Sequence, residues 1–358
     1  MTLRSPQFSR HKRVENSTIT PSTLPLRRQW LRAGLSAAVL GAVAATLGSW
    51  HGNAQAQAQN QAWPNRPVKL LVGFPPGSSP DVMARTIAEP LARELGQPVV
   101  VENRPGAGGN IAADLVARAT DGHTLGLMIN GNMTIAKILN PATPYDPLTD
   151  LAPVSLLATA PLVLAAATTV PGTGADLLKE GEFAGLRWNY GTPGVGTVAH
   201  IGMEMLKNAA GLEAVHVPYP GNPQVINAMM QGDIHISLLP PGLAMPQVNA
   251  GKLKAVGVTS AGRSSIVPNL PSLSEIGLQG FQLEIWNAVA APRGMPQAHI
   301  DRLAGLLTQI VRRPDVREKI FQQGWQVAGT SPQGLANRVR TDTEKMKAVI
   351  ETNNIRPQ

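Results

Sequence analysis

WPNRPVKLLVGFPPGSSPDVMARTIAEPLARELGQPVVVENRPGAGGN, residues Trp63 to Asn110, is the stretch that decides the fold. Pro67 to Val72 is a short apolar run typical of a buried strand, and the proline- and glycine-rich loop after it cannot continue that strand. From Asp81 onward, apolar residues recur with helical spacing. The stretch therefore predicts a strand, a loop and a helix, followed by a second strand and a second glycine-rich loop.

The first loop, Gly73 to Asp81, is the first candidate site. A strand that leads through such a loop into a helix presents unpaired N–H groups to one point in space, which favours an anion. Gly77 permits close approach, and the hydroxyls of Ser78 and Ser79 can donate to a carboxylate. Asp81 could cap the helix by accepting from its first amides, or it could receive a ligand's ammonium group.

Composition places the chain among globular proteins with a sizeable core. It has 358 residues, of which 43% are hydrophobic, and no cysteine. Without cysteine there is no thiol catalysis, no cysteine-based zinc site and no lipoprotein anchor. The net charge of +8 is concentrated at one end, because residues 1–32 carry seven Lys or Arg and one Glu, a sum of +6, and the rest carries +2. A nucleic-acid partner is therefore not expected, since its binder should be basic in the folded part.

The N-terminal end has the pattern of an export signal. Arg27 and Arg28 precede a small-residue apolar run, Ala33 to Leu47, and an Ala-Gln-Ala site follows at residues 54–56. This order is typical of a secretory signal peptide, and the paired arginines favour the twin-arginine type over the general secretory type. We expect residues 1–58 to be signal and leader, and the mature protein to be soluble in the periplasm.

The rest of the chain alternates strand and helix patterns in two successive blocks. The first block predicts strands at 67–72, 98–102 and 124–129, with helices at 81–95, 110–119 and 132–139. Two apolar runs, 152–157 and 161–167, follow as the first crossover. The second block predicts strands at 188–190, 214–217, 234–239 and 253–258, with helices at 198–210, 222–230 and 243–249. Strands separated by helices indicate βαβ units and a parallel sheet in each block.

The C-terminal part predicts a strand at 282–290 and helices at 296–311, 314–323 and 332–351. A final strand and long helices can return to the first block. We therefore predict an α/β protein with two doubly wound lobes and a central cleft. Lobe 1 is 59–160 plus 285–358, and lobe 2 is 161–284. Two crossovers between lobes permit hinge closure over a ligand.

Two further motifs are candidates for ligand contact. Residues 191–200, GTPGVGTVAH, form a second cluster of donors at a helix start, with Thr192 and Thr197 beside glycines. The Rossmann and P-loop glycine patterns are both absent. His200 has no nearby serine or acid, so a structural role bonded to backbone is favoured over a catalytic one. Tyr219, in a proline-rich loop, could stack on a ligand or donate to it.

No catalytic or metal-binding set emerges from the sequence. The seven histidines include no H-x-x-x-H or H-x-H pair, and G-x-S-x-G is absent. An exported hydrolase using His200 and Ser78 is the competing class, but the loops offer no activated nucleophile. We expect no catalytic residues, no metal and no cofactor.

Taken together, the chain resembles the Bug-type periplasmic solute receptors, the substrate-binding component of tripartite tricarboxylate transporters. The resemblance covers Trp63 to about Ile350. It rests on the stretch quoted above and on DGHTLGLMINGN, YDPLTDLAPVSLLA, NYGTPGVGTVAH, VHVPYPG and AGKLKAVGVTSAGRS.

The resemblance implies a fold of the periplasmic-binding-protein type (type II-like), with a small carboxylate-bearing solute gripped between the lobes. It implies no bond-making chemistry, a monomer, and delivery of the ligand to membrane transporter subunits or to a sensor. The ligand-binding residues that it implies are Phe74, Pro76, Gly77, Ser78, Ser79, Asp81, Asn130, Thr192, Gly194, Gly196, Thr197, His200 and Tyr219.

The chain departs from these receptors at positions that affect ligand choice. Ser78 replaces a common glycine, Asn287 replaces an aromatic residue or glycine, and residues 238–241 are apolar where an acid or amide is common. An amino-acid ligand needs a counter-charge for its ammonium group. We therefore expect an amine-free carboxylate with an apolar or aromatic far end.

Overall fold

The computed structural model describes residues 63–184 and 187–356, and residues 63–358 form one compact unit. The predicted signal and leader lie outside the described residues. Among the described residues, no helix is both long and apolar enough to cross a bilayer.

The first sheet has six strands in the order β11-β4-β10-β3-β1-β2. Its strands are β1 (Val68–Val72), β2 (Val99–Asn103), β3 (Thr124–Ile129), β4 (Leu151–Ala160), β10 (Ile285–Pro292) and β11 (Gln326–Val327). β1 is parallel to β2 and β3, whereas β10 is antiparallel to both β3 and β4. The sheet is therefore mixed, not purely parallel as predicted.

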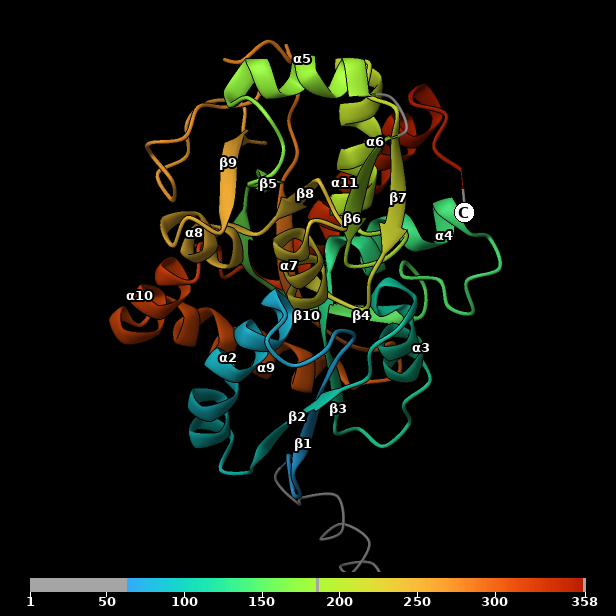
Figure 1. The fold of residues 1–358 in the computed structure, drawn as a ribbon. Helices are drawn as coiled ribbons and strands as arrows, with labels where there is room; N and C mark the ends of the chain where they lie inside the picture. Colours follow the sequence, from blue (N-terminus) through green and yellow to red (C-terminus); the bar gives the residue numbers. More distant parts are fainter. Residues whose placement is uncertain (1–62, 185–186, 357–358) are drawn as a thin grey trace, which may run out of the picture. The chain divides into compact units, whose positions relative to one another are not determined.

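The second sheet has five strands in the order β7-β6-β8-β5-β9. They are β5 (Val163–Ala167), β6 (Trp188–Thr192), β7 (Ala214–Pro218), β8 (Ile236–Leu239) and β9 (Leu253–Val258). β6 is parallel to β7 and β8, and β5 is antiparallel to β8 and β9. β10 in the first sheet and β5 in the second are each antiparallel to both neighbours and enter their sheet after a crossover of the chain (Figure 1). The short β11 at the edge of the first sheet is antiparallel to β4 as well.

The helices cover the sheets and end at predictable residues. In the first block these are α2 (Ser79–Leu95), η1 (Ala107–Gly109), α3 (Asn110–Ala117), the π-helix η2 (Gly131–Ile135) and α4 (Ala136–Leu139). The next are α5 (Gly174–Ala184), α6 (Val198–Ala210), α7 (Asn222–Gln231) and α8 (Pro241–Asn249), and the last are α9 (Gln297–Arg312), α10 (Pro314–Gln322) and α11 (Pro332–Thr352). α2 and α6 both end at a left-handed glycine, Gly96 and Gly211, because a residue without Cβ adopts a positive φ without strain.

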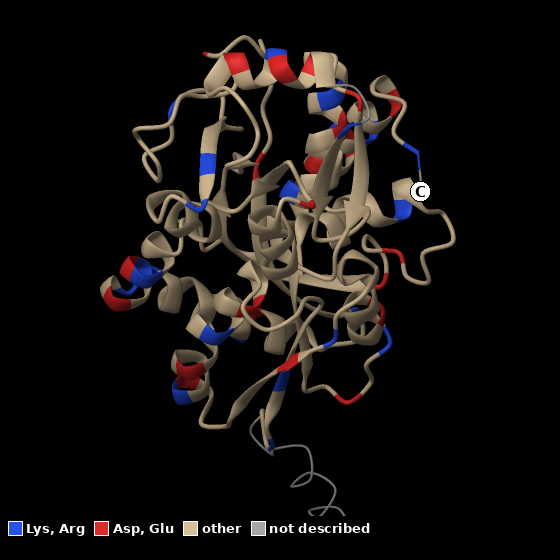
Figure 2. Cartoon of the chain, viewed as in Figure 1, with Lys and Arg blue, Asp and Glu red and all other residues tan. Residues whose placement is uncertain are grey.

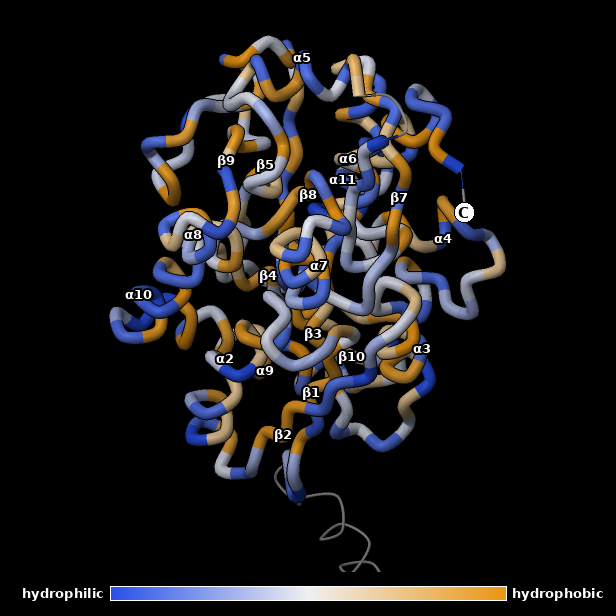
Figure 3. The backbone as a smooth tube through the Cα atoms, viewed as in Figure 1, coloured by the Kyte–Doolittle hydropathy of each residue, from blue (hydrophilic) through white to orange (hydrophobic). Residues whose placement is uncertain are grey.

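Charged side chains lie on outer helices and carry both signs. α5 and α10 each mix Lys or Arg with Asp or Glu (Figure 2). Neither helix forms the single-sign basic face that a nucleic-acid binder presents. The strands are mostly apolar (Figure 3), although Lys69, Glu102 and Lys254 lie in β1, β2 and β9. All residues of β5 are buried.

Separate apolar clusters pack the two sheets. Val72, Ile87 and Leu307 belong to the cluster between the first sheet and helices α2 and α9. The C-terminal helix α11 contributes to two clusters: Val339 packs with the first sheet, and Ile350 packs with residues of the second. The chain crosses between the sheets after β4 and again before β10. The α/β fold with two sheets agrees with the predicted fold class, and the numerical lobe limits stay a prediction.

Candidate functional site

A small cavity lies where the two sheets' loops meet. Its lining includes Phe74 and Asn130, which follow strands of the first sheet, and Thr197 and Leu238 from the second. The cavity volume is about 50 Å³. One water needs roughly 10–15 Å³ on this scale, so in this conformation the cavity has room for about three to five waters or for a ligand portion of that size.

The N-terminal ends of four helices line this cavity. They are represented by Ser79 and Pro80 of α2, by Val198 and Ala199 of α6, by Asn222 of α7, and by Pro240 just before α8. The first intrahelical bonds run from Val82 N to Ser78 O (3.0 Å) and from Ile201 N to Thr197 O (3.1 Å). N–H groups earlier in each first turn have no intrahelical acceptor and carry the positive end of the helix dipole. The cavity is therefore suited to an anion.

Among the described residues, no charged side chain lines the cavity. The described lining residues are apolar, proline, Ser, Thr or Asn. Large apolar side chains, among them Phe74, Trp286 and Trp325, form its walls. Any charge complementarity thus comes from backbone dipoles. A ligand's apolar part would meet these walls.

Two lining side chains are buried without a hydrogen-bond partner among the described residues. Ser79 is 7% exposed and its Oγ is unpartnered; Asn287 is fully buried, and neither Nδ2 nor Oδ1 is bonded. A buried polar group without a partner costs roughly 1–3 kcal/mol. Groups left in this condition at a cavity are candidates for contact with a bound molecule.

Asn130, at the end of β3, is held by its own backbone contact. Its Nδ2 donates to the carbonyl of Glu284 at 2.9 Å, and Thr134 Oγ1 donates to the Asn130 carbonyl at 2.7 Å. These bonds fix the residue at the cavity edge, beside Ile129 of the same strand.

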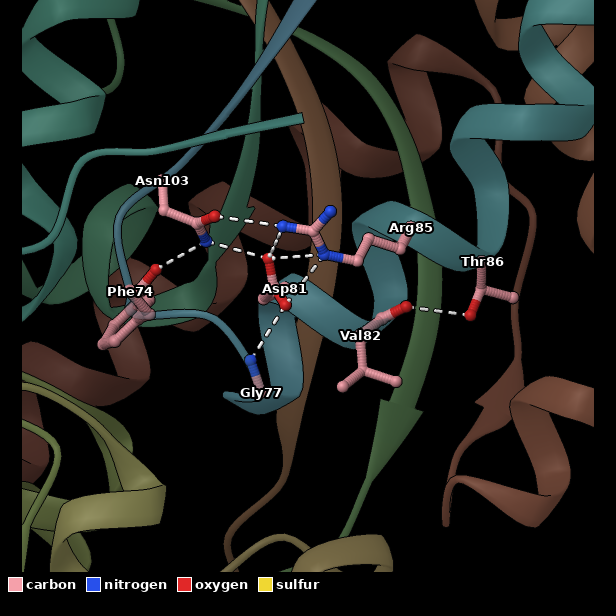
Figure 4. Close-up of polar contacts among 7 residues, drawn as sticks. All are labelled: Phe74, Gly77, Asp81, Val82, Arg85, Thr86 and Asn103. Carbon is pink, nitrogen blue, oxygen red and sulfur yellow. Dashed lines mark hydrogen bonds and ion pairs between the residues drawn. The ribbon is translucent and has the colours of Figure 1, made fainter. Parts of the chain in front are cut away.

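Asp81 is occupied by internal contacts instead of capping α2. Its carboxylate accepts from Gly77 N (2.9 Å), from Asn103 Nδ2 (2.8 Å) and from the Arg85 guanidinium (Figure 4). Burial alone would raise the pKa of Asp81, but the hydrogen bonds from Arg85, Asn103 and Gly77 outweigh it and lower the pKa below its usual value. The residue before the helix, Ser78, makes no side-chain cap. Asp81 therefore ties the loop backward to β2, which differs from the predicted helix cap.

The second loop is organised by Thr192 and Thr197. Thr192 Oγ1 lies 2.7 Å from His216 Nε2, and Thr197 Oγ1 donates to the carbonyl of Gly194 at 2.8 Å. Thr197 also caps α6 by accepting from His200 N at 3.3 Å. Gly194 and Gly196 adopt positive φ, which this tight approach to the helix start requires. The loop thereby aims the first turn of α6 at the cavity.

His200 is buried in a stack of rings. Its ring centroid lies 4.6 Å from that of His216, and the His216 ring in turn stacks on Tyr190 with 4.7 Å between centroids. Burial, with the neighbouring His216, lowers the pKa of His200 to about 4. His200 Nε2 and Ser78 Oγ each lack a hydrogen-bond partner among the described residues, so they are not bonded to each other. The serine–histidine pair of the alternative hydrolase is not assembled in this structure.

Four of the predicted site residues line the cavity: Phe74, Ser79, Asn130 and Thr197. The others surround it in the loops or behind them: Pro76, Gly77, Ser78, Asp81, Thr192, Gly194, Gly196, His200 and Tyr219. Whether any of them contacts a ligand stays a prediction. Sequence reasoning did not include Trp325 or Asn222 among the ligand-binding residues, and it singled out Asn287 only as a departure that affects ligand choice. A lone amide in the apolar run Ile285–Pro292 was a usable signal for Asn287.

Larger grooves elsewhere contain arginines but do not form a comparable site. One of about 620 Å³ is lined by Arg312 and Arg317, and one of about 460 Å³ by Arg263 and Arg338. Three of these guanidiniums are already paired: Arg338 with Glu284 and Asp342, Arg263 with Glu275, and Arg312 with the Gly329 carbonyl. Within residues 63–184 and 187–356, no group of three or more metal-ligating side chains comes together.

Comparisons with known proteins match this geometry to one family. Residues 83–355 match the model of the tripartite tricarboxylate transporter family receptor. The chain is 34% identical, over 81% of its length and 87% of the relative's, to the UPF0065 protein in the tcbD-tcbE intergenic region of Pseudomonas sp. (strain P51).

Two solved structures from Rhodopseudomonas palustris are also similar. One, determined with adipate, is 30% identical with a TM-score of 0.80, and the match covers 83% of this chain and all of that one. The other, MatC with bound malate, is 31% identical with a TM-score of 0.77, covering 80% of this chain and all of that one. The match over residues 83–355 and the fold shared with these two structures lead to one assignment: this chain belongs to the tripartite tricarboxylate transporter receptor family of periplasmic solute-binding proteins.

Proposed function

We propose that this protein is a periplasmic receptor that binds a small amine-free carboxylate and presents it to a tripartite tricarboxylate-type transporter. The observation that carries the proposal is a cavity that four helix N-termini line and that no charged side chain of the described part of the chain reaches. Each helix end contributes roughly 0.3–1 kcal/mol to anion binding, and more when buried.

The preference for an amine-free ligand rests on the second sheet's contribution. Leu238 and Pro240 line the cavity where a carboxylate or amide could have met an ammonium group. An ammonium taken from water into this site would have no counter-charge, which is costly. Phe74, Trp286 and Trp325 would instead receive an apolar or aromatic portion. The adipate and malate in the two similar structures belong to the same broad class of small carboxylates.

The proposal includes closure of two lobes, 59–160 plus 285–358 and 161–284, over the ligand. The chain passes between the sheets at residues 160–163 and 258–285. Two connecting segments between the same two lobes permit a hinge motion. The proposed receptor is a monomer in the periplasm, and it releases the ligand chemically unchanged. Transfer to transporter subunits and signalling to a sensor both remain compatible with this site.

A thermal-shift screen of the purified protein tests the proposal. The panel contains mono-, di- and tricarboxylates, aromatic acids, and amino acids as the amine-bearing comparison. A ligand at 100 times its dissociation constant should stabilise the protein by about 2.7 kcal/mol. We expect a shift with at least one amine-free acid and none with its amino analogue.

Two results would contradict the proposal. If amino acids alone shift the midpoint, the ligand class is wrong. If no acid shifts it while an ester or amide is hydrolysed, the protein is an enzyme instead.

A further inference from the structure

Asn287 is a lining residue whose side-chain donor and acceptor both lack a hydrogen-bond partner among the described residues. It lies on β10, between Ile129 of β3 and Ala158 of β4, with a register shift between Asn287 and Ala288 on the β4 side. The side chain is fully buried, and both Nδ2 and Oδ1 lack a partner among the described residues. It also lines the same cavity as the N-terminal turns of α2 and α6.

Three other polar side chains of the lining, unlike Asn287, do not leave both a donor atom and an acceptor atom without a partner. Asn130 donates its Nδ2 to a backbone carbonyl, and Thr197 both donates to Gly194 and accepts from His200. Ser79 has a single unpartnered hydroxyl. Asn287 therefore offers an unpaired donor and an unpaired acceptor side by side on a strand.

A plain carboxylate satisfies only half of that pair. It accepts from Nδ2 but has no proton for Oδ1, which would stay buried and unbonded. A hydroxyl on the carbon next to a carboxylate supplies the missing donor, because O–H can reach Oδ1 while a neighbouring oxygen accepts from Nδ2. Because the cavity volume is only about 50 Å³, one short molecule can contact both Asn287 and the helix N-termini.

Resting on the proposed carboxylate-receptor function, we propose that Asn287 is a specificity-determining residue that selects hydroxycarboxylates over the same acids without the hydroxyl. Leaving a buried polar group unpaired in the competing complex is a strong basis for such discrimination. Selection would thus come from a strand residue and anion attraction from the helix ends.

Matched ligand pairs test the inference by calorimetry on the whole protein. The pairs are malate and succinate, 2-hydroxyglutarate and glutarate, and lactate and propionate. The expected result is that the wild type binds the hydroxylated member of at least one pair roughly tenfold or more tightly. The variant Asn287→Leu, similar in size but without donor or acceptor, should bind both members with nearly equal affinity.

Ser237→Ala is the matched control. Ser237 is a buried residue of β8 beside the lining residue Leu238, and its Oγ donates to the Gly191 carbonyl at 2.8 Å. Removing this hydroxyl should leave the ratio of the two affinities within each ligand pair unchanged.

Three outcomes decide between the statements. Equal affinity of the wild type for both members of every pair it binds overturns the role of Asn287 while the receptor function stands; this needs no folded variant. A preference that survives in Asn287→Leu overturns it as well. If the wild type binds none of these acids nor any other carboxylate, the proposed function itself fails.

Discussion

The buried carboxylate of Asp81 stabilises the shape of the first loop, because it accepts hydrogen bonds from Gly77, Arg85 and Asn103. Asp81→Asn keeps the side-chain shape but removes the charge. We expect the free energy of unfolding to fall by roughly 1–3 kcal/mol, toward the lower end since Arg85 is 53% exposed. Urea denaturation at pH 7 measures it.

The pH dependence of this difference has a defined sign. The folded pKa of Asp81 lies below 3.8, so its contribution is complete above that pH and is lost as the pH falls through the lowered folded pKa. The difference in unfolding free energy between the wild type and Asp81→Asn should therefore become smaller as the pH falls through this lowered pKa. Asp114→Asn, which removes a surface ion pair with Arg118, is the control and should change stability by less than about 0.5 kcal/mol. A loss of equal size in both variants would contradict the role of Asp81.

His200 predicts a second, separate pH effect. Its pKa is lowered from 6.5 to about 4, so the neutral ring stabilises the fold fully above pH 6.5 and progressively less as the pH falls from 6.5 toward 4. We expect the wild type to lose roughly 2–3 kcal/mol of unfolding free energy between pH 7 and 4.5 through this residue. His200→Gln cannot titrate, so it should lose that much less over the same interval. Parallel pH profiles of the two proteins, from urea denaturation, would show that His200 is not responsible.

The residue scale is also where sequence-based prediction was least complete. Ser79 and Thr197 could be proposed because they sit in recognisable loops before helices, and both line the cavity. Asn287 and Trp325 reach it from segments more than 80 residues away from either loop in the sequence. Nothing local in the chain encodes that convergence, since it follows from how β10 enters the sheet.

Helix caps link local sequence to the site at the scale of elements. Thr197→Val removes the side-chain acceptor for His200 N and the donor to Gly194 O. It should destabilise the protein by about 1 kcal/mol and also weaken carboxylate binding, because the first turn of α6 lines the cavity. Thr197→Ser should restore both properties. Denaturation and calorimetry provide the two measurements.

α11 offers the matched control for this cap. Ser331 Oγ accepts from Gly334 N at 3.1 Å, and neither residue lines the cavity. Ser331→Ala should lower stability by a similar amount with unchanged affinity. If Thr197→Val behaved the same way, the cap would support the fold alone.

Most elements were predictable where periodicity and punctuation agreed. Helix 198–210 and strand 253–258 have the predicted bounds, since each is bordered by glycine or a cap. α5 (Gly174–Ala184) was missed because glycines at both 174 and 181 interrupt its apolar pattern. β11 has two residues, too few for any alternation. The antiparallel entry of β5 and β10 depends on the chain crossing between sheets, which alternation alone does not indicate.

At the scale of the whole molecule, loops that belong to the two sheets approach each other closely at glycine residues. A Cβ on Gly131 would lie 2.8 Å from the Gly196 carbonyl oxygen, and one on Gly194 would lie 2.9 Å from Gly108 Cα. Gly131 is helical, so an alanine there meets steric resistance without an unfavourable φ. We expect Gly131→Ala to hinder closure and to weaken carboxylate binding about tenfold by calorimetry.

Gly305→Ala separates this effect from a general helix substitution. Gly305 lies in α9, and nothing stands within 4 Å of a Cβ placed there. That variant should bind like the wild type. Small-angle scattering should report a more open average for Gly131→Ala in the presence of ligand. Equal affinity of all three proteins would mean that this contact is not needed in the bound state.

The helix N-termini around the cavity have an evolutionary consequence. Every residue except proline carries the same N–H group, so most substitutions in those first turns leave the donors in place. Substitutions in these first turns can therefore accumulate without deleting the backbone donors that we propose hold the anion. Walls such as Leu238 and Trp325 consist of side chains, so a substitution there changes the shape of the cavity. A scaffold of this kind can acquire a new ligand through substitutions in its walls while keeping its hold on the acid.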